Sequence, residues 1–206
     1  MKVQVIFGGI VLAALLGTGT VSAQNVGGGV KIGANFATVG GDPGCGSSCT
    51  KSVRTGGIGG GFLIARITDM IAFQPEVLYS QEGVKLQGTD RGQAFEATAK
   101  IGTVQIPLLL RVAPKMTSGG ASGYFIVGPA IGVIASAKQE QGGQTEDFKD
   151  DLKSWDASIV FGGGVTISHF LVEARYAAGM TDLNKTPEST GKVRSNVFSI
   201  LVGGSW

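Results

Sequence analysis

Isolated charged residues of both signs lie within otherwise apolar stretches. Their types and spacing would allow them to pair with one another or to bind ions. Lys31, Glu76, Arg111, Glu173 and Arg175 each interrupt a segment of mostly small or apolar residues. A charge buried in an apolar interior needs a partner of opposite sign, because an unpaired charge there is very costly. We therefore predict that these five side chains form an ion-pair network inside the fold. The alternative is that they line a narrow or gated path for ions.

The sequence offers little that could support catalysis. His169 is the single histidine, and it follows Ser168 in what the pattern predicts to be a short exposed turn. A serine hydrolase also needs a positioned carboxylate and an oxyanion hole, and no Gly-x-Ser-x-Gly elbow is present. The glycine-rich stretch Gly56–Gly61 does not open a helix, so it is not a phosphate cradle. We predict no enzyme activity, no catalytic residue, no cofactor and no metal site.

Cys45 and Cys49 are the only cysteines, and they lie in a Gly/Ser-rich loop. An even number of cysteines in an exported protein favours a disulfide. A metal or redox site is the alternative, but no histidine or paired acidic residue is adjacent. We predict a Cys45–Cys49 disulfide that closes a small loop.

The N-terminus has the pattern of a secretory signal peptide. Lys2 precedes an apolar run from Val3 to Leu16, and small residues follow up to Ala23. We predict cleavage after Ala23, and a single domain over residues 24–206; a membrane anchor is the alternative. The net charge of +2 does not suggest nucleic acid as a partner. Charged residues make up only 16% of the chain and mean hydropathy is +0.24, which is unusual for a soluble secreted domain.

Eight segments alternate apolar and small or polar residues with a period of two, which predicts β-strands. They are Gly28–Thr38, Val53–Ile67, Met70–Glu82, Phe95–Ala113, Tyr124–Lys138, Ser154–Ile167, Phe170–Met180 and Val197–Trp206. Long connections (39–52, 83–94, 139–153, 181–194) alternate with shorter ones (68–69, 114–120, 168–169). This alternation is typical of outer-membrane barrels. The predicted fold is all-β: an eight-stranded antiparallel up-and-down transmembrane β-barrel with both termini on the periplasmic side.

The direction of the two strand faces decides between a membrane and a soluble barrel. The polar face is mostly Gly, Ala, Ser and Gln, which makes a poor surface for water but a good filling for a narrow eight-strand interior. Aromatic residues lie toward the strand ends on the apolar face, as in the girdles at lipid–water interfaces. They are Phe36, Phe73, Tyr79, Phe170, Tyr176, Phe198 and Trp206. We therefore predict that the apolar face meets lipid. A soluble exported lipid-binding barrel, with its apolar face lining a cavity, is the alternative.

Six short motifs lie along the predicted strands: Val30–Ala37, Phe73–Gln81, Ile106–Leu110, Val127–Pro129, Glu173–Tyr176 and Asn196–Phe198. Together they resemble the PorT-like outer-membrane β-barrel family of Bacteroidetes-type bacteria. The resemblance covers nearly all of the chain after the signal, and it implies an eight-stranded barrel in the bacterial outer membrane but little about activity. The terminal Trp206 stands where Phe or Tyr is common in the family. The cysteine pair has no counterpart there.

Several roles follow from this reading. The first is an integral outer-membrane barrel with a structural or surface-interaction role, displaying its long loops outside the cell. The second is a small or gated channel. A hydrolase or acyltransferase barrel is a third, but it lacks a nucleophile–base pair in the sequence. For partners we expect outer-membrane lipid, the barrel-assembly machinery acting on the C-terminal strand, and an envelope or secretion partner that the sequence does not name.

Overall fold

A computed structural model describes residues 26–40, 49–90, 93–114, 120–141, 144–147, 154–181 and 194–206. Its elements are β1 (Val26–Gly40), β2 (Cys49–Arg66), β3 (Ile71–Asp90), β4 (Gln93–Val112), β5 (Ala121–Gln141), β6 (Gln144–Asp147), β7 (Trp155–Ile167), β8 (Phe170–Gly179) and β9 (Arg194–Ser205). All strand pairs are antiparallel. Within the described residues, no helix is long and apolar enough to cross a bilayer.

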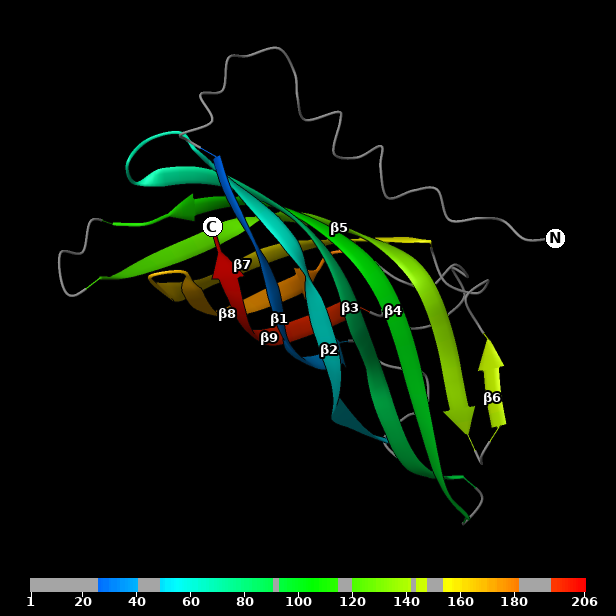
Figure 1. Cartoon of the computed structure of the whole chain (residues 1–206). Helices are drawn as coiled ribbons and strands as arrows, with labels where there is room; N and C mark the ends of the chain where they lie inside the picture. Colours follow the sequence, from blue (N-terminus) through cyan, green and yellow to red (C-terminus); the bar gives the residue numbers. More distant parts are fainter. Residues whose placement is uncertain are drawn as a thin grey trace.

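The strands form a closed barrel (Figure 1). Their order is β4-β3-β2-β1-β9-β8-β7-β5, and β4 pairs with β5 to close the ring. The short β6 pairs only with the outer end of β5, where Lys138 stands opposite Asp147, so it lies outside the ring. The predicted eight-stranded antiparallel barrel is confirmed. Closure leaves no unpaired strand edge in the ring, which is the condition for a sheet to stand in lipid.

The two ends of the barrel differ. At one end, here called the short-turn end, lie the turns at 67–70 and 168–169, the end of β4, the start of β5, the start of β1 and the end of β9. The termini of β1 and β9 are tied together there, since the Trp206 amide donates to the Gly28 carbonyl. At the other end, the long-loop end, β3, β4 and β5 run well beyond the rest of the barrel, toward the lower right of Figure 1.

Two loop predictions were wrong at the long-loop end. The sequence predicted loops at 83–94 and 139–153, but β3 continues to Asp90, β4 begins at Gln93, and β6 follows β5 directly. The physical reason is that these outer strand segments stand above the barrel, where neither sheet face must be apolar. A polar segment there keeps its backbone pairing without showing the alternation of a buried strand.

Face orientation follows the prediction on most strands. Val30, Ile32, Val77 and Val172 are about half exposed on the outside, whereas Glu76 and Glu173 on the same strands are buried in the lumen. On β2 the expected orientation was wrong. Ile58 and Phe62 point inward and are 4% exposed, and Leu63 points outward. The lumen therefore contains apolar as well as polar layers.

The outward apolar face is long enough to cross a membrane. On β7, exposed apolar side chains run from Trp155 to Ile167, which spans the whole 13-residue strand. With a rise of about 3.3 Å per residue and a tilt of about 40°, this strand covers roughly 30 Å. The apolar belt of an outer-membrane barrel is about 25 Å tall.

Candidate functional site

The centre of the lumen holds a four-residue ion-pair network. The Lys31 Nζ atom on β1 lies 2.6 Å from Glu76 Oε1 and 2.9 Å from Glu173 Oε1. Arg175 Nη1 lies 2.8 Å from Glu76 Oε2 and 3.8 Å from Glu173 Oε1. All four side chains are nearly fully buried. Two cations face two carboxylates, so the network is neutral, which offsets much of the cost of burying four charges.

The network comes from strands far apart in the sequence but adjacent or opposite in the barrel. Glu76 points inward from β3, Lys31 from β1, and Glu173 and Arg175 are successive inward residues of β8. Small neighbours make room for them. A Cβ on Gly162 would lie 2.7 Å from the Arg175 Cβ, and one on Gly203 would lie 2.8 Å from the Lys31 Cβ. The glycine richness noted in the sequence thus provides space for large inward side chains.

Arg111, the fifth predicted member, lies beside this network on its short-turn side. Its Nη1 donates to Gln74 Oε1 (3.0 Å), and Gln74 Nε2 in turn donates to Glu76 Oε1 (2.7 Å). Its Nη2 donates to Thr166 Oγ1 (3.2 Å). The guanidinium also lies 3.5 Å from the centroid of the Tyr124 ring, a cation–π contact. Arg111 therefore reaches the carboxylates through Gln74.

Tyr124 completes the network, and the sequence analysis did not include it. Its hydroxyl donates to Glu173 Oε2 at 3.0 Å, and the residue is 2% exposed. A Cβ on Gly164 would lie 2.6 Å from the Tyr124 ring, so glycine is needed opposite the ring. An aromatic residue in a membrane barrel is expected to face lipid. The sequence signal that Tyr124 points inward is Gly164, the residue paired with it on the neighbouring strand β7.

An apolar layer lies next to the network on its long-loop side. Ile58, Leu78 and Leu201 contact one another across the lumen, and Leu78 and Leu201 are 1% and 0% exposed. A second cluster contains Leu109, Ile126, Ala130 and Val160, together with Tyr124. The first cluster comes from β2, β3 and β9 and the second from β4, β5 and β7, so buried apolar side chains enter the lumen from both parts of the ring.

A second polar layer follows toward the long-loop end. Asn35 Nδ2 donates to Ser80 Oγ (2.7 Å), and Ser199 Oγ donates to Asn35 Oδ1 (2.7 Å). Ser80 then donates to Glu82 Oε1 at 2.9 Å. The Glu82 carboxylate also accepts hydrogen bonds from Gln105 and Ser195. Glu82 extends the inward row of Gln74, Glu76, Leu78 and Ser80 on β3, so the period-two pattern could have found it.

The predicted interface aromatics lie on the outside in two groups. Near the short-turn end are Phe73, Phe170 and Trp206, the last two about three-quarters exposed. Higher up, Phe36, Phe198 and Tyr176 stand opposite one another on β1, β9 and β8. Phe161 on β7 extends this row, with its ring 5.5 Å from that of Tyr176. Tyr79 lies on the outer face of β3, with its hydroxyl over Gly102.

The remaining predicted residues are placed as follows. His169 and Ser168 form the exposed β7–β8 turn, and Ser168 has a φ of 53°. Cys45 and the side chain of Cys49 lie outside the described residues, so the disulfide stays a prediction. Among the residues that the structure describes, no three His, Cys, Asp or Glu side chains gather as metal ligands would.

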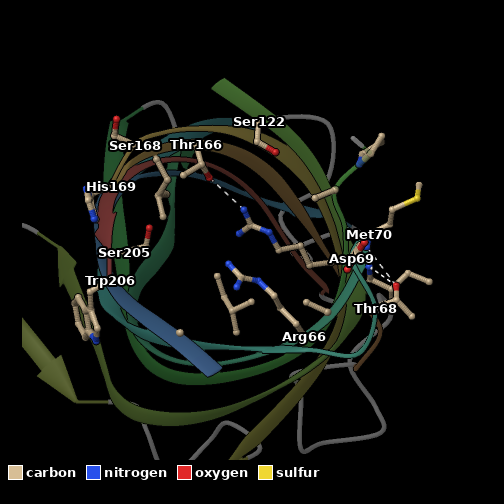
Figure 2. Close-up of a pocket in the computed structure, with 18 residues that line it drawn as sticks. Arg66, Thr68, Asp69, Met70, Ser122, Thr166, Ser168, His169, Ser205 and Trp206 are labelled. Carbon is tan, nitrogen blue, oxygen red and sulfur yellow. Dashed lines mark hydrogen bonds between the residues drawn. The ribbon is translucent and has the colours of Figure 1, made fainter. Parts of the chain in front are cut away.

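An open cavity of about 670 Å³ occupies the short-turn end of the lumen (Figure 2). Its floor includes Arg111, Thr166 and Leu171, and its rim includes Arg66 and Trp206. It ends at the Arg111 layer, below the ion-pair network.

The closed ring, the lipid-length apolar exterior and the charged interior define a transmembrane β-barrel. The sequence matches the model of the outer membrane protein beta-barrel domain family over residues 22–185. The chain therefore belongs to this outer-membrane β-barrel family, and membership places it in the bacterial outer membrane. No curated protein is similar enough in sequence to count as a relative.

Solved barrels resemble the chain at low identity. Ail, the attachment invasion locus protein of Yersinia pestis, is 16% identical, with 87% of this chain and 98% of that chain covered and a TM-score of 0.43. Neisserial surface protein A is 14% identical, with 86% and 96% covered and a TM-score of 0.49. The N-terminal barrel domain of Pseudomonas aeruginosa OprF is 14% identical, with 88% and 98% covered and a TM-score of 0.36.

Proposed function

We propose that the protein is a sealed outer-membrane barrel that displays an extended β-sheet at the cell surface, in a surface-interaction role. In this proposal the short-turn end and both termini face the periplasm, and the long-loop end faces outward. The asymmetry of the two ends supports this orientation, because outer-membrane barrels keep short turns inside and long excursions outside.

The filling of the lumen by buried side chains is the observation that supports the sealed-barrel proposal. The apolar layer of Ile58, Leu78 and Leu201 lies between the ion-pair network and the Asn35–Glu82 layer. Ions crossing this layer would lose their hydration without gaining polar partners. Eight strands also leave an interior only wide enough for side chains. These features favour a closed barrel over the small or gated channel.

The displayed sheet is the second support. Beyond the barrel rim, residues 84–90 of β3 pair with 93–99 of β4, and the outer part of β4 pairs with β5. β6 and the first residues of β2 widen this sheet on its two sides. By contrast, β7 and β8 end at Trp155 and Gly179. A sheet of this kind presents paired strands rather than bare loops to a partner (Figure 1).

Conductance in planar bilayers tests the seal. We expect the refolded protein to give no conductance steps under conditions in which a channel-forming porin, added as positive control, gives them. Steady single-channel steps from the purified barrel would overturn the sealed-barrel proposal in favour of the channel.

Antibody access on intact cells tests the orientation. An epitope inserted between residues 91 and 92, at the tip of the β3–β4 hairpin, should be reached from outside. The matched insertion between Ser168 and His169 should be reached only after the outer membrane is permeabilised. The opposite pattern of access would overturn the orientation.

The finer assignments belong to the same proposal. The quoted motifs support PorT-like membership, and the pattern of residues 1–23 supports a cleaved signal peptide. The alternating C-terminal strand ending in Trp206 supports recognition by the barrel-assembly machinery. A non-enzymatic role is supported by the central network, since Lys31, Arg175, Glu76 and Glu173 are engaged with one another.

A further inference from the structure

The cavity at the short-turn end is lined by two arginine residues, Arg66 and Arg111. The network above the cavity is balanced within itself, with Lys31 and Arg175 against Glu76 and Glu173. Arg111 adds a further cation, whose direct hydrogen bonds go to the neutral Gln74 and Thr166. The hydrogen bonds to Gln74 and Thr166 and the Tyr124 ring hold this guanidinium in place, and Arg111 is one of the residues that line the cavity.

Arg66 brings a second guanidinium into the same cavity. It is the last residue of β2, is exposed, and points into the cavity in Figure 2. Arg66 and Arg111 are both among the residues that line this cavity. Within the described residues, Arg66 has no hydrogen-bond or ion-pair partner. Two guanidinium groups held near each other without a shared carboxylate are a ready arrangement for an anion.

The rest of the lining fits an anion with an attached organic group. The lining includes the hydroxyl-bearing residues Ser122, Thr166 and Ser205, and the exposed turn residues Ser168 and His169 stand at its edge. Among the described residues of the lining, Asp69 is the one acidic residue, and it has an interaction of its own. The cavity volume of about 670 Å³ exceeds what a bare phosphate or sulfate would fill. Trp206, about three-quarters exposed, lies at the rim and faces the lipid side.

We propose that this cavity binds a phosphate ester, with Arg66 and Arg111 contacting the phosphate oxygens and the hydroxyls contacting the ester group. Arg66 supplies the free fork of donors, and Arg111 supplies a fixed charge on the floor. Either a soluble phosphate ester or the glycerophosphate headgroup of a membrane lipid carries this chemistry. Only the second source depends on the proposed orientation, in which the cavity opens at the inner leaflet.

Titration calorimetry on the refolded barrel in an uncharged detergent tests the site. The probes are glycerol 3-phosphate, inorganic phosphate and, as a carboxylate, acetate. We expect saturable binding of glycerol 3-phosphate, with acetate at least ten-fold weaker. Arg66→Gln should weaken binding at least ten-fold. Arg66→Lys keeps the charge but loses the forked donors of the guanidinium, so its affinity should lie between those of the parent protein and Arg66→Gln. Lys138→Gln, an equal loss of charge at the opposite end of the barrel, should leave binding unchanged.

The lipid source has its own arm. The barrel is placed in nanodiscs of phosphatidylcholine with or without phosphatidylglycerol. Both the parent protein and Arg66→Gln carry Trp155→Phe, so that Trp206 is the tryptophan whose fluorescence is measured. The fluorescence of the two proteins is then compared in each lipid. An Arg66-dependent shift only with phosphatidylglycerol assigns the lipid headgroup; a shift only on adding glycerol 3-phosphate assigns a soluble ester.

Three results would overturn the site: no saturable binding of any phosphate probe in either arm, equal binding of acetate, or equal loss of binding in Arg66→Gln and Lys138→Gln. Because no outcome depends on conductance or on antibody access, failure here is distinguishable from failure of the sealed-barrel proposal.

Discussion

Removing the positive charge of Lys31 should destabilise the barrel far more than removing any exposed lysine. The Lys31 ammonium bridges Glu76 and Glu173 at 2.6 and 2.9 Å. In Lys31→Met, the two carboxylates would share only Arg175, so the buried network would carry one uncompensated negative charge. Breaking a buried pair in this way costs about 3–5 kcal/mol. We expect the free energy of unfolding to fall by that amount.

A second substitution should restore most of the loss. Glu173 is the carboxylate left with the weaker contacts, since its remaining cation, Arg175, is 3.8 Å away. In Lys31→Met/Glu173→Gln, one cation again faces one carboxylate, and the neutral amide at 173 still accepts from the Tyr124 hydroxyl. We expect the double variant to lie within about 1–2 kcal/mol of the parent, because neutral replacements of a buried pair are often tolerated.

Urea-induced unfolding of the barrel in lipid vesicles measures these free energies. Boiled and unboiled samples compared on a gel report the folded fraction at each urea concentration. Lys138→Met is the matched control, since Lys138 is exposed, and it should change stability by less than about 0.5 kcal/mol. The reasoning is refuted if Lys31→Met costs less than about 1 kcal/mol, or if the double variant is no more stable than Lys31→Met alone.

Three further predictions concern packing, assembly and the loop cysteines. Gly162→Val should prevent stable folding, because the new Cβ would lie 2.7 Å from the Arg175 Cβ. The control Gly61→Val should fold normally, since the nearest atom to its Cβ would be 3.6 Å away. Gel mobility before and after boiling distinguishes a folded variant from an unfolded one. Trp206→Ala should lower the amount of folded barrel in the outer membrane several-fold, while Trp206→Phe should leave that amount unchanged. Cell fractionation followed by blotting measures both variants. Equal amounts in the two variants would contradict a role for the aromatic side chain at position 206. Alkylation without reduction should leave Cys45 and Cys49 unlabelled in mass spectra of the exported protein, and labelling of both would exclude the disulfide.

The sequence by itself determined the architecture of the barrel. Period-two alternation on β1, β3, β4 and β8 identified both the strands and their lipid-facing sides, because lipid on one face and a narrow lumen on the other impose opposite chemistry on successive residues. The same pattern placed Lys31, Glu76 and Glu173 inside. The number of alternating segments predicted the strand count, and the alternating connection lengths predicted that the long connections share one end, since each strand turns back at the membrane boundary.

Only the tertiary structure decided which of these inward residues meet. Alternation fixes the face of a side chain, but not the register between strands, and Lys31 and Glu173 are brought together by the β1–β9–β8 pairing across 142 residues. The inward direction of Tyr124 and Phe62 was also decided there, because an aromatic ring fits the lumen only where a neighbouring strand contributes glycine. The outer hairpin escaped sequence reasoning for a related reason: above the membrane both sheet faces meet water, so the backbone stays paired while the alternation that reveals a strand disappears.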